Sequence, residues 1–129
     1  MEITTRMEFD AGHRIPGHKN TCKNLHGHRY ALEVTIKGEI IQQESASEFG
    51  MVIDFKDAKD LIKSTIVDRW DHAFIVYDKD QEVVDFLSTL KDHKTVTLSK
   101  VPTAENMALI AFESIKEVFK EKFSDSIIP

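Results

Sequence analysis

The sequence predicts an α+β domain in which two helices pack on one face of an antiparallel β-sheet. Three observations lead to this fold class. Two early segments alternate apolar and polar residues, two later segments repeat apolar residues every three to four positions, and the strands precede the helices along the chain. A chain of 129 residues is long enough to bury one core, so we expect a single domain over residues 1–129.

Alternation with a period of two predicts the strands. The apolar sides of the first and second strands consist of Ile3, Thr5, Met7 and Phe9, and of Tyr30, Leu32, Val34 and Ile36. Gly38 ends the second run, and a polar loop follows through Gly50. We predict that "MVID", at residues 51–54, forms a third strand that pairs antiparallel with the second.

Helical spacing begins after Asp54, which is placed as an N-cap. The apolar side of this first helix consists of Phe55, Ala58, Leu61, Ile62, Thr65 and Ile66. Residues 71–99 are less regular, with a short helix near residues 83–90 and a short strand in "TVTLS". The last helix follows Pro102, with Thr103 as its cap.

The last helix carries one continuous apolar stripe, which we interpret as core packing. Its members are Ala104, Met107, Ala108, Ala111, Phe112, Ile115, Val118 and Phe119. With both helices on one face, the opposite face of the sheet needs a cover. An oligomer of the same chain is the simplest source of one.

Composition excludes several classes of function. The net charge is -5 and the charged residues of both signs are interspersed, so nucleic acid is not an expected partner. The one cysteine cannot form an internal disulfide, and no signal-peptide pattern is visible. The apolar runs are far shorter than the roughly 20 residues of a membrane-spanning helix. We therefore expect a cytoplasmic protein that does not bind membranes.

Three histidines are placed to converge on a metal ion. His26 and His28, in "HGH" at the start of the second strand, point to the same side of an extended chain. His13 follows the first strand, and in an antiparallel pair this end lies beside the start of the second strand. Three imidazoles suit zinc and leave a fourth position open for water or substrate. For His18 and His93 we expect ordinary structural roles.

The chain's single thiol has three possible roles. Cys22 could be a fourth zinc ligand, a base or nucleophile near the metal, or a small buried apolar residue, although its polar surroundings argue against burial. Asp71 and His72 form a carboxylate–imidazole pair that could set a proton-transfer group if the chain turns there. By itself this dipeptide is a weak signal.

Five ordered motifs make the chain similar to one enzyme family. "FDAGHR", "CKNLHGH", "GMVIDF", "WDHAF" and "PTAEN" resemble the 6-pyruvoyltetrahydropterin synthase and 6-carboxytetrahydropterin synthase family, from about residue 7 to residue 119. The resemblance implies the tunnelling fold (T-fold), a four-stranded antiparallel sheet with two helices on one face. It also implies assembly into trimers or hexamers.

The resemblance implies a role for each candidate residue. His13, His26 and His28 would hold Zn²⁺. The catalytic thiol would be Cys22, and the proton-relay group would be completed by Asp71 and His72. The pterin pocket would be shaped by Thr103 and Glu105.

The implied function is zinc-dependent synthesis of 6-carboxy-5,6,7,8-tetrahydropterin. The substrate would be 7,8-dihydroneopterin triphosphate, and acetaldehyde and triphosphate would be released. Only three residues separate Cys22 from His26, which favours the bacterial enzymes of the queuosine pathway. The alternatives are a 6-pyruvoyltetrahydropterin synthase, which eliminates triphosphate only, and a non-catalytic, zinc-stabilised binding module.

The chain departs from the family pattern after its last helix. Family members continue into a final strand that carries a glutamate, which anchors the pterin ring. Here the sequence reads "FSDSIIP". We therefore expect the domain to lack that strand.

Overall fold

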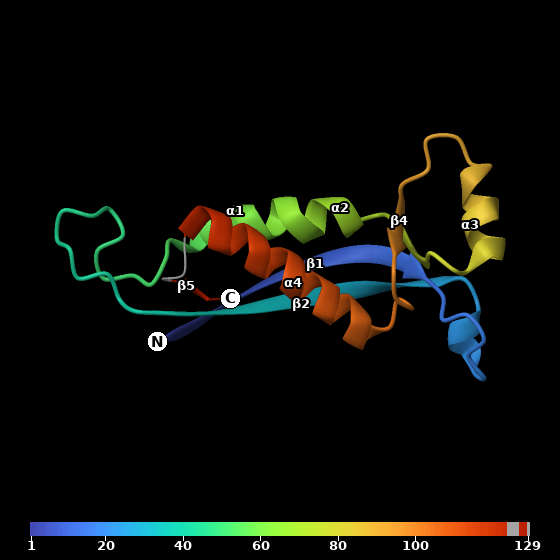
Figure 1. The fold of residues 1–129 in the computed structure, drawn as a ribbon, viewed down its shortest axis with the longest axis horizontal. Coiled ribbons are helices and arrows are strands. Elements are labelled where there is room, and N and C mark those ends of the chain that lie inside the picture. Colours follow the sequence, from blue (N-terminus) through green and yellow to red (C-terminus); the bar gives the residue numbers. More distant parts are fainter. Residues whose placement is uncertain (124–126, 129) are drawn as a thin grey trace. The chain divides into compact units, whose positions relative to one another are not determined.

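The computed structural model describes residues 1–123, 127 and 128, which form a mixed α and β structure (Figure 1). Five strands form one sheet in the order β4-β3-β1-β2-β5. The chain divides into two compact units, and the long strands β1 (Glu2–His13) and β2 (His26–Gly38) contribute residues to both. No helix among the described residues has the length and apolar character needed to cross a membrane.

Strands β1 and β2 are neighbours in the sheet, and their contacts show that the two strands run in opposite directions. The hydroxyls of Thr4 and Thr35 lie 2.9 Å apart, and the rings of Phe9 and Tyr30 stack with centroids 5.2 Å apart. Because partners early in β1 lie opposite partners late in β2, the pair is antiparallel. The predicted alternation is confirmed, since the apolar side of each strand is the more buried side throughout.

The first compact unit contains residues 1–7, residues 31–68 and the chain from Ala111 onward. Helix α1 (Phe55–Ile62) begins where predicted, because the Asp54 side chain accepts a hydrogen bond from the backbone N–H of Lys56 at 2.7 Å. Its course continues through a π-helical segment, η2 (Lys63–Val67), into α2 (Asp68–Trp70). The apolar core of this unit consists of Val34, Ile36, Val52, Ile53, Ala58, Ile62, Ile66, Val67, Ala111, Ile115 and Phe119.

The second compact unit contains residues 8–30 and 69–110. Its elements are the end of β1, the start of β2, η1 (Thr21–Lys23), β3 (Phe74–Tyr77), α3 (Gln81–Ser88), β4 (Thr95–Leu98) and the start of α4 (Ala104–Phe123). Val76 of β3 packs with Val83 and Leu87 of α3, and Phe74 and Val84 border this cluster. All the candidate site residues belong to this unit.

The sheet is mixed, which corrects the antiparallel prediction. Strand β3 pairs parallel with β1, with Gly12 opposite Phe74, and parallel with β4. The segment "MVID" was also predicted wrongly, because residues 51–54 form no strand. Of these four residues, only Met51 bonds to the segment after β2: its carbonyl oxygen accepts a 2.8 Å hydrogen bond from the N–H of Ile41. Val52 and Ile53 are both buried, which an alternating strand does not produce.

The predicted cap of helix α4 is confirmed, but fewer residues of the predicted apolar stripe are buried than expected. The Thr103 hydroxyl accepts a hydrogen bond from the backbone N–H of Asn106 at 3.2 Å. The buried stripe consists of Met107, Ala111, Ile115 and Phe119. Ala104, Ala108 and Phe112, which were predicted in the stripe, are exposed. After the helix, Ile127–Ile128 form the short strand β5, antiparallel to Lys37 and Gly38 of β2, where no strand was expected.

Candidate active site

Three histidine rings meet where β1 ends and β2 begins. The ring centroids of His13 and His26 lie 4.6 Å apart, those of His13 and His28 5.1 Å, and those of His26 and His28 4.8 Å. One nitrogen from each ring lies within 4.8 Å of the others, which is the arrangement of a group that can hold a metal ion. The convergence predicted from strand geometry is therefore present.

Backbone carbonyls orient two of these rings. The Nδ1–H of His13 donates to the carbonyl oxygen of Pro102 at 2.8 Å, and the Nδ1–H of His26 donates to that of Asn24 at 2.6 Å. A carbonyl oxygen only accepts, so each Nε2 carries a lone pair and is available as a ligand. The Nε2 of His13 is buried and has no hydrogen-bond partner within the described part of the chain. Such an orphaned acceptor is what a metal would satisfy.

Burial also favours the ligand form of His13. Desolvation lowers the pKa of this imidazole, and the nearby His26 and His28 lower it further, although the hydrogen bond to Pro102 opposes them. The side chain is 7% exposed. A neutral imidazole is the form that binds metal. The three imidazoles, and the orientation of the His13 and His26 rings, therefore fit Zn²⁺, which takes nitrogen ligands and tetrahedral geometry.

Two glycines permit close packing beside the histidines, Gly27 between β2 and β1 and Gly12 between β1 and β3. A Cβ added to Gly27 would lie 3.1 Å from the carbonyl oxygen of Ala11. A Cβ added to Gly12 would lie 2.8 Å from the ring of Phe74. The glycine within "HGH" thus has a steric reason, because a side chain at this position would crowd the backbone of β1.

Tyr30, which was expected only as part of the second strand, lies beside the histidine group. Its ring lies 5.7 Å from that of His28 and 5.9 Å from that of His13, centroid to centroid. Burial raises the pKa of Tyr30 to about 12, so the phenol keeps its proton. The signal was available, because Tyr30 follows His28 by two residues and shares its face of β2.

Cys22 lies in the loop between β1 and β2, within η1. The thiol is free and partly exposed, and the residue belongs to neither group of potential ligands found among the described residues. The backbone carbonyl of Cys22 accepts a 2.7 Å hydrogen bond from the N–H of Ile15. The same loop carries Asn24, so it supplies both a thiol and the carbonyl that orients the His26 ring.

Asp71 and His72 form a second group, together with Asp10. His72 Nδ1 lies 3.0 Å from Asp71 Oδ2, and Asp71 Oδ1 accepts a 3.0 Å bond from the backbone N–H of Asp10. The backbone N–H of His72 in turn donates to the carbonyl of Asp10 at 2.6 Å. The turn that the pair needs is present, because His72 has a φ of 60°. The bond from Asp10, and then that from His72, lower the pKa of Asp71.

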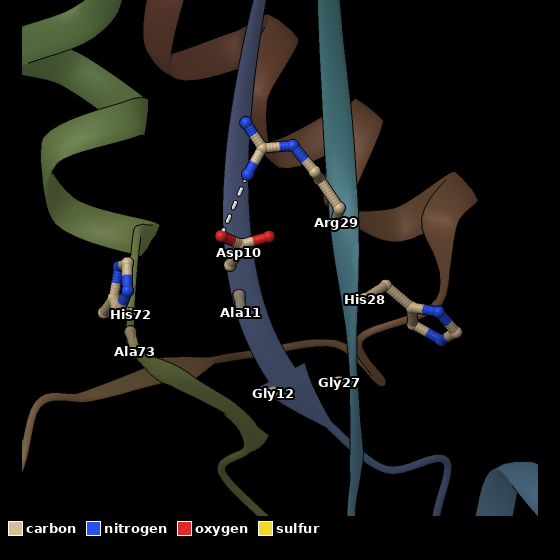
Figure 2. Close-up of a pocket in the computed structure, with 8 residues that line it drawn as sticks. All are labelled: Asp10, Ala11, Gly12, Gly27, His28, Arg29, His72 and Ala73. Carbon is tan, nitrogen blue, oxygen red and sulfur yellow. Dashed lines mark hydrogen bonds and ion pairs between the residues drawn. The ribbon is translucent and has the colours of Figure 1, made fainter.

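The histidine group and the group of Asp10, Asp71 and His72 lie on different faces of β1. His13 is on the odd-numbered, buried side of β1, whereas Asp10 is on the even-numbered side, where Arg29 pairs with it at 3.0 Å. Figure 2 shows His72 beside β1 and the His28 ring directed away beyond β2. A shallow hollow of about 410 Å³ adjoins the Asp10 face; its lining is Asp10, Ala11, Gly12, Gly27, His28, Arg29, His72 and Ala73.

The other candidates have simple surroundings. Thr103 caps α4, and Glu105 is exposed in the first turn of that helix. The ring of His18 accepts a bond from the N–H of Asn20, and that of His93 bonds the Thr95 hydroxyl at 2.7 Å. Neither His18 nor His93 belongs to a ligand group among the residues that the structure describes.

Comparison with known proteins decides the family. A sequence model described as "6-pyruvoyl tetrahydropterin synthase" matches residues 2–126. The chain belongs to the 6-pyruvoyl tetrahydropterin synthase family. Among relatives in the family, the 6-carboxy-5,6,7,8-tetrahydropterin synthase of Rickettsia bellii is 44% identical over 109 residues, which is 84% of this chain and 75% of that protein. The Haemophilus influenzae protein of the same name is 39% identical, over 89% of this chain and 82% of its own.

Solved structures agree with the family assignment. The 6-pyruvoyl tetrahydropterin synthase of Caenorhabditis elegans matches with a TM-score of 0.61 and 29% identity, covering 92% of this chain and 78% of its own. An uncharacterised protein from Wolinella succinogenes matches with a TM-score of 0.79 at 19% identity, covering 99% of this chain and 88% of its own, a likeness of fold alone. The predicted T-fold, with helices on one face of the sheet, is confirmed apart from the parallel pairing of β3.

Proposed function

We propose that this protein is a zinc-dependent 6-carboxy-5,6,7,8-tetrahydropterin synthase. It converts 7,8-dihydroneopterin triphosphate and water into 6-carboxytetrahydropterin, acetaldehyde and triphosphate, and it serves queuosine biosynthesis in the cytoplasm. The names of the relatives from Rickettsia bellii and Haemophilus influenzae support this product. The observation that carries the proposal is the histidine group, whose three ligand nitrogens lie within 4.8 Å of one another.

The histidines would hold the zinc ion and keep one position open. When bound there, Zn²⁺ supplies Lewis acidity, which polarises the oxygens of the substrate side chain. The carbonyls of Pro102 and Asn24 hold the His13 and His26 rings in the ligand orientation. Cys22 belongs to no ligand group among the described residues, which favours a catalytic role for its thiol over a fourth-ligand role.

Proton transfer is assigned to Cys22 and to the Asp71–His72 pair. Asp71 fixes the His72 ring through the 3.0 Å contact with Nδ1, which leaves Nε2 of His72 to accept or donate a proton at the substrate. In one chain this pair lies beside Asp10, on the face of β1 opposite His13. We propose that a second copy of the chain brings an Asp71–His72 pair to the metal centre, so the active enzyme is a trimer or hexamer.

Thr103 and Glu105 are proposed to bind the pterin. They begin α4 immediately after Pro102, whose carbonyl orients His13. The exposed Glu105 carboxylate offers two acceptor oxygens to ring N–H groups.

A second candidate is elimination of triphosphate to give the 6-pyruvoyl product. The description of the matching family and the name of the Caenorhabditis elegans neighbour favour it. Both reactions use the same metal centre, but only the first cleaves a carbon–carbon bond. Acetaldehyde is therefore the product that separates them.

The experiment is a turnover assay with mass analysis of the products. Zinc-loaded protein is incubated with 7,8-dihydroneopterin triphosphate, and acetaldehyde is trapped as a hydrazone. We expect about one zinc per chain, loss of zinc in the His26→Ala variant, and a Cys22→Ala variant that keeps zinc but not turnover. Loss of zinc from the Cys22→Ala variant would instead make the thiol a ligand.

Chelation tests whether the zinc site is catalytic or structural. For a non-catalytic, zinc-stabilised module, removal of zinc should unfold the domain. We expect the chelated protein to keep its far-ultraviolet circular dichroism and to lose turnover, because the core of each unit is apolar and does not include the metal.

A further inference from the structure

We propose that the Tyr30 hydroxyl is a positioning group that donates a hydrogen bond to the oxygen ligand at the open position of the metal. This inference rests on the proposed zinc site. Nothing in the sequence motifs or in the family description assigns a role to Tyr30. It follows from an unpaired buried hydroxyl beside a group of metal ligands.

The hydroxyl of Tyr30 is removed from solvent and has no hydrogen-bond partner among the described residues. Buried hydroxyls are nearly always paired, because an unpaired one loses its hydrogen bonds to water without replacement. In the part of the chain that the structure describes, three buried side-chain atoms are unpaired, in Thr5, His13 and Tyr30. Two of these three, His13 Nε2 and Tyr30 Oη, belong to rings that contact each other, which points to a shared missing partner.

The surroundings of Tyr30 restrict what that partner can be. One face of its ring stacks on Phe9 at an interplanar angle of 17°, which offers the hydroxyl no acceptor. The rings of His13 and His28 meet the Tyr30 ring edge to face, at 84° and 78°. The Nδ1 of His13 is already engaged with Pro102, and its Nε2 is directed to the metal centre in this proposal. Since no described residue accepts from the Tyr30 hydroxyl, the proposed acceptor is an oxygen bound at that centre.

A metal-bound oxygen is also a favourable acceptor chemically. A phenol is a donor that stays protonated near neutral pH, and a water or substrate hydroxyl bound to a divalent cation carries increased negative charge as it loses its proton. A fixed donor at this place would select the orientation of that oxygen. Groups that support a metal site in this way typically change metal affinity by 10–100-fold when they are removed.

The test compares Tyr30→Phe with wild type, with and without zinc. Phe keeps the ring and its stacking on Phe9 and removes only the hydroxyl. Without metal, the variant should be as stable as wild type or more stable, because an unpaired buried hydroxyl is removed. With zinc, we expect its dissociation constant to rise at least about tenfold, measured by competition with a chromophoric chelator. The thermal shift caused by zinc should fall accordingly.

Thr5→Val provides the matched control. Thr5 is 6% exposed, its hydroxyl is also buried and unpaired, and it belongs to the other compact unit. Valine has nearly the same shape, so this variant also removes one orphaned hydroxyl. We expect its metal-free stability to change in the same direction as that of Tyr30→Phe, and its zinc affinity to equal that of wild type.

A Co²⁺-substituted protein gives a readout of the site itself. The visible absorption of Co²⁺ reports its ligands and geometry, so Tyr30→Phe should alter the spectrum and Thr5→Val should not. If Tyr30→Phe binds zinc as tightly as wild type and leaves the Co²⁺ spectrum unchanged, the inference is wrong while the zinc site stands. If wild type itself binds neither metal, the proposed function fails first.

Discussion

Arg14 and Asp80 form a two-point ion pair that joins the end of β1 to the start of α3. The guanidinium Nε lies 2.7 Å from Oδ2 of Asp80, and Nη2 lies 2.6 Å from Oδ1. The Asp80 side chain is 5% exposed and that of Arg14 is 21% exposed. The hydrogen bonds to Asp80 raise the pKa of Arg14, so the guanidinium stays charged. This partly buried pair fixes the segment that directly follows His13.

Replacing Arg14 with Met should destabilise the fold strongly. The change leaves the Asp80 carboxylate buried without its cation, which typically costs about 3–5 kcal/mol. The free energy of unfolding in urea, measured on metal-free protein, gives the value. Lys56→Met is the matched control, because Lys56 and Asp60 are 2.7 Å apart but 80% and 62% exposed. Such an exposed pair contributes little to stability, because water and salt screen it. Equal losses in both variants would contradict the argument from burial.

Gly12→Ala should strain the contact between β1 and β3. The new Cβ would lie 2.8 Å from the Phe74 ring, closer than carbon atoms approach without displacement. Overpacking of this kind costs about 1–3 kcal/mol. Phe74→Leu removes the ring carbons that clash. Gly12→Ala should therefore cost less stability in the Phe74→Leu background than in the wild-type protein. A double-mutant cycle of unfolding free energies measures this coupling, and strict additivity would show that the ring was not the obstacle.

Asp71→Asn should change how stability depends on pH. The pKa of Asp71 is lowered in the folded protein, first by the backbone N–H of Asp10 and then by His72, so the unfolded chain binds its proton at a higher pH. The stabilisation is therefore fully present above the ordinary aspartate pKa of about 3.9 and is lost as the pH falls through the lower, folded value. Asn has no proton to bind. Unfolding curves between neutral and strongly acidic pH should show the two proteins differing most near neutrality and converging in acid.

The strands and helices that the sequence predicted correctly share a visible period. In β1 and β2 the alternate residues are buried, and at α1 and α4 the caps Asp54 and Thr103 hold the first turns. The histidine group was predictable for the same reason, because residues two apart share a face. The remaining elements depend on which strands pair with one another in the folded protein.

Strand β3 shows why periodicity was insufficient. Its sequence, "FIVY", has Ile75 and Val76 buried side by side, since neighbours flank it on both edges and its two faces are covered. A short apolar run of this kind has no period to detect. Its parallel pairing with β1 depends on the crossover from α1, which no local pattern reveals. The placement of Asp71 and His72 next to Asp10 follows from that pairing, so it could not be predicted either.

His13→Ala and His26→Ala should separate metal binding from fold stability. Both variants remove a ligand, so both should lose zinc, as measured by metal analysis after dialysis. Only His13 is buried, at 7% exposure, and its removal also leaves the Pro102 carbonyl without its 2.8 Å donor. An unsatisfied buried acceptor costs about 1–3 kcal/mol, so metal-free His13→Ala should unfold at clearly lower urea concentration than wild type. His26 is more exposed and bonds a carbonyl in a loop, so metal-free His26→Ala should remain within about 0.5 kcal/mol of wild type. If the two metal-free variants are equally stable, the Pro102 bond does not stabilise the fold and serves only to orient the ligand.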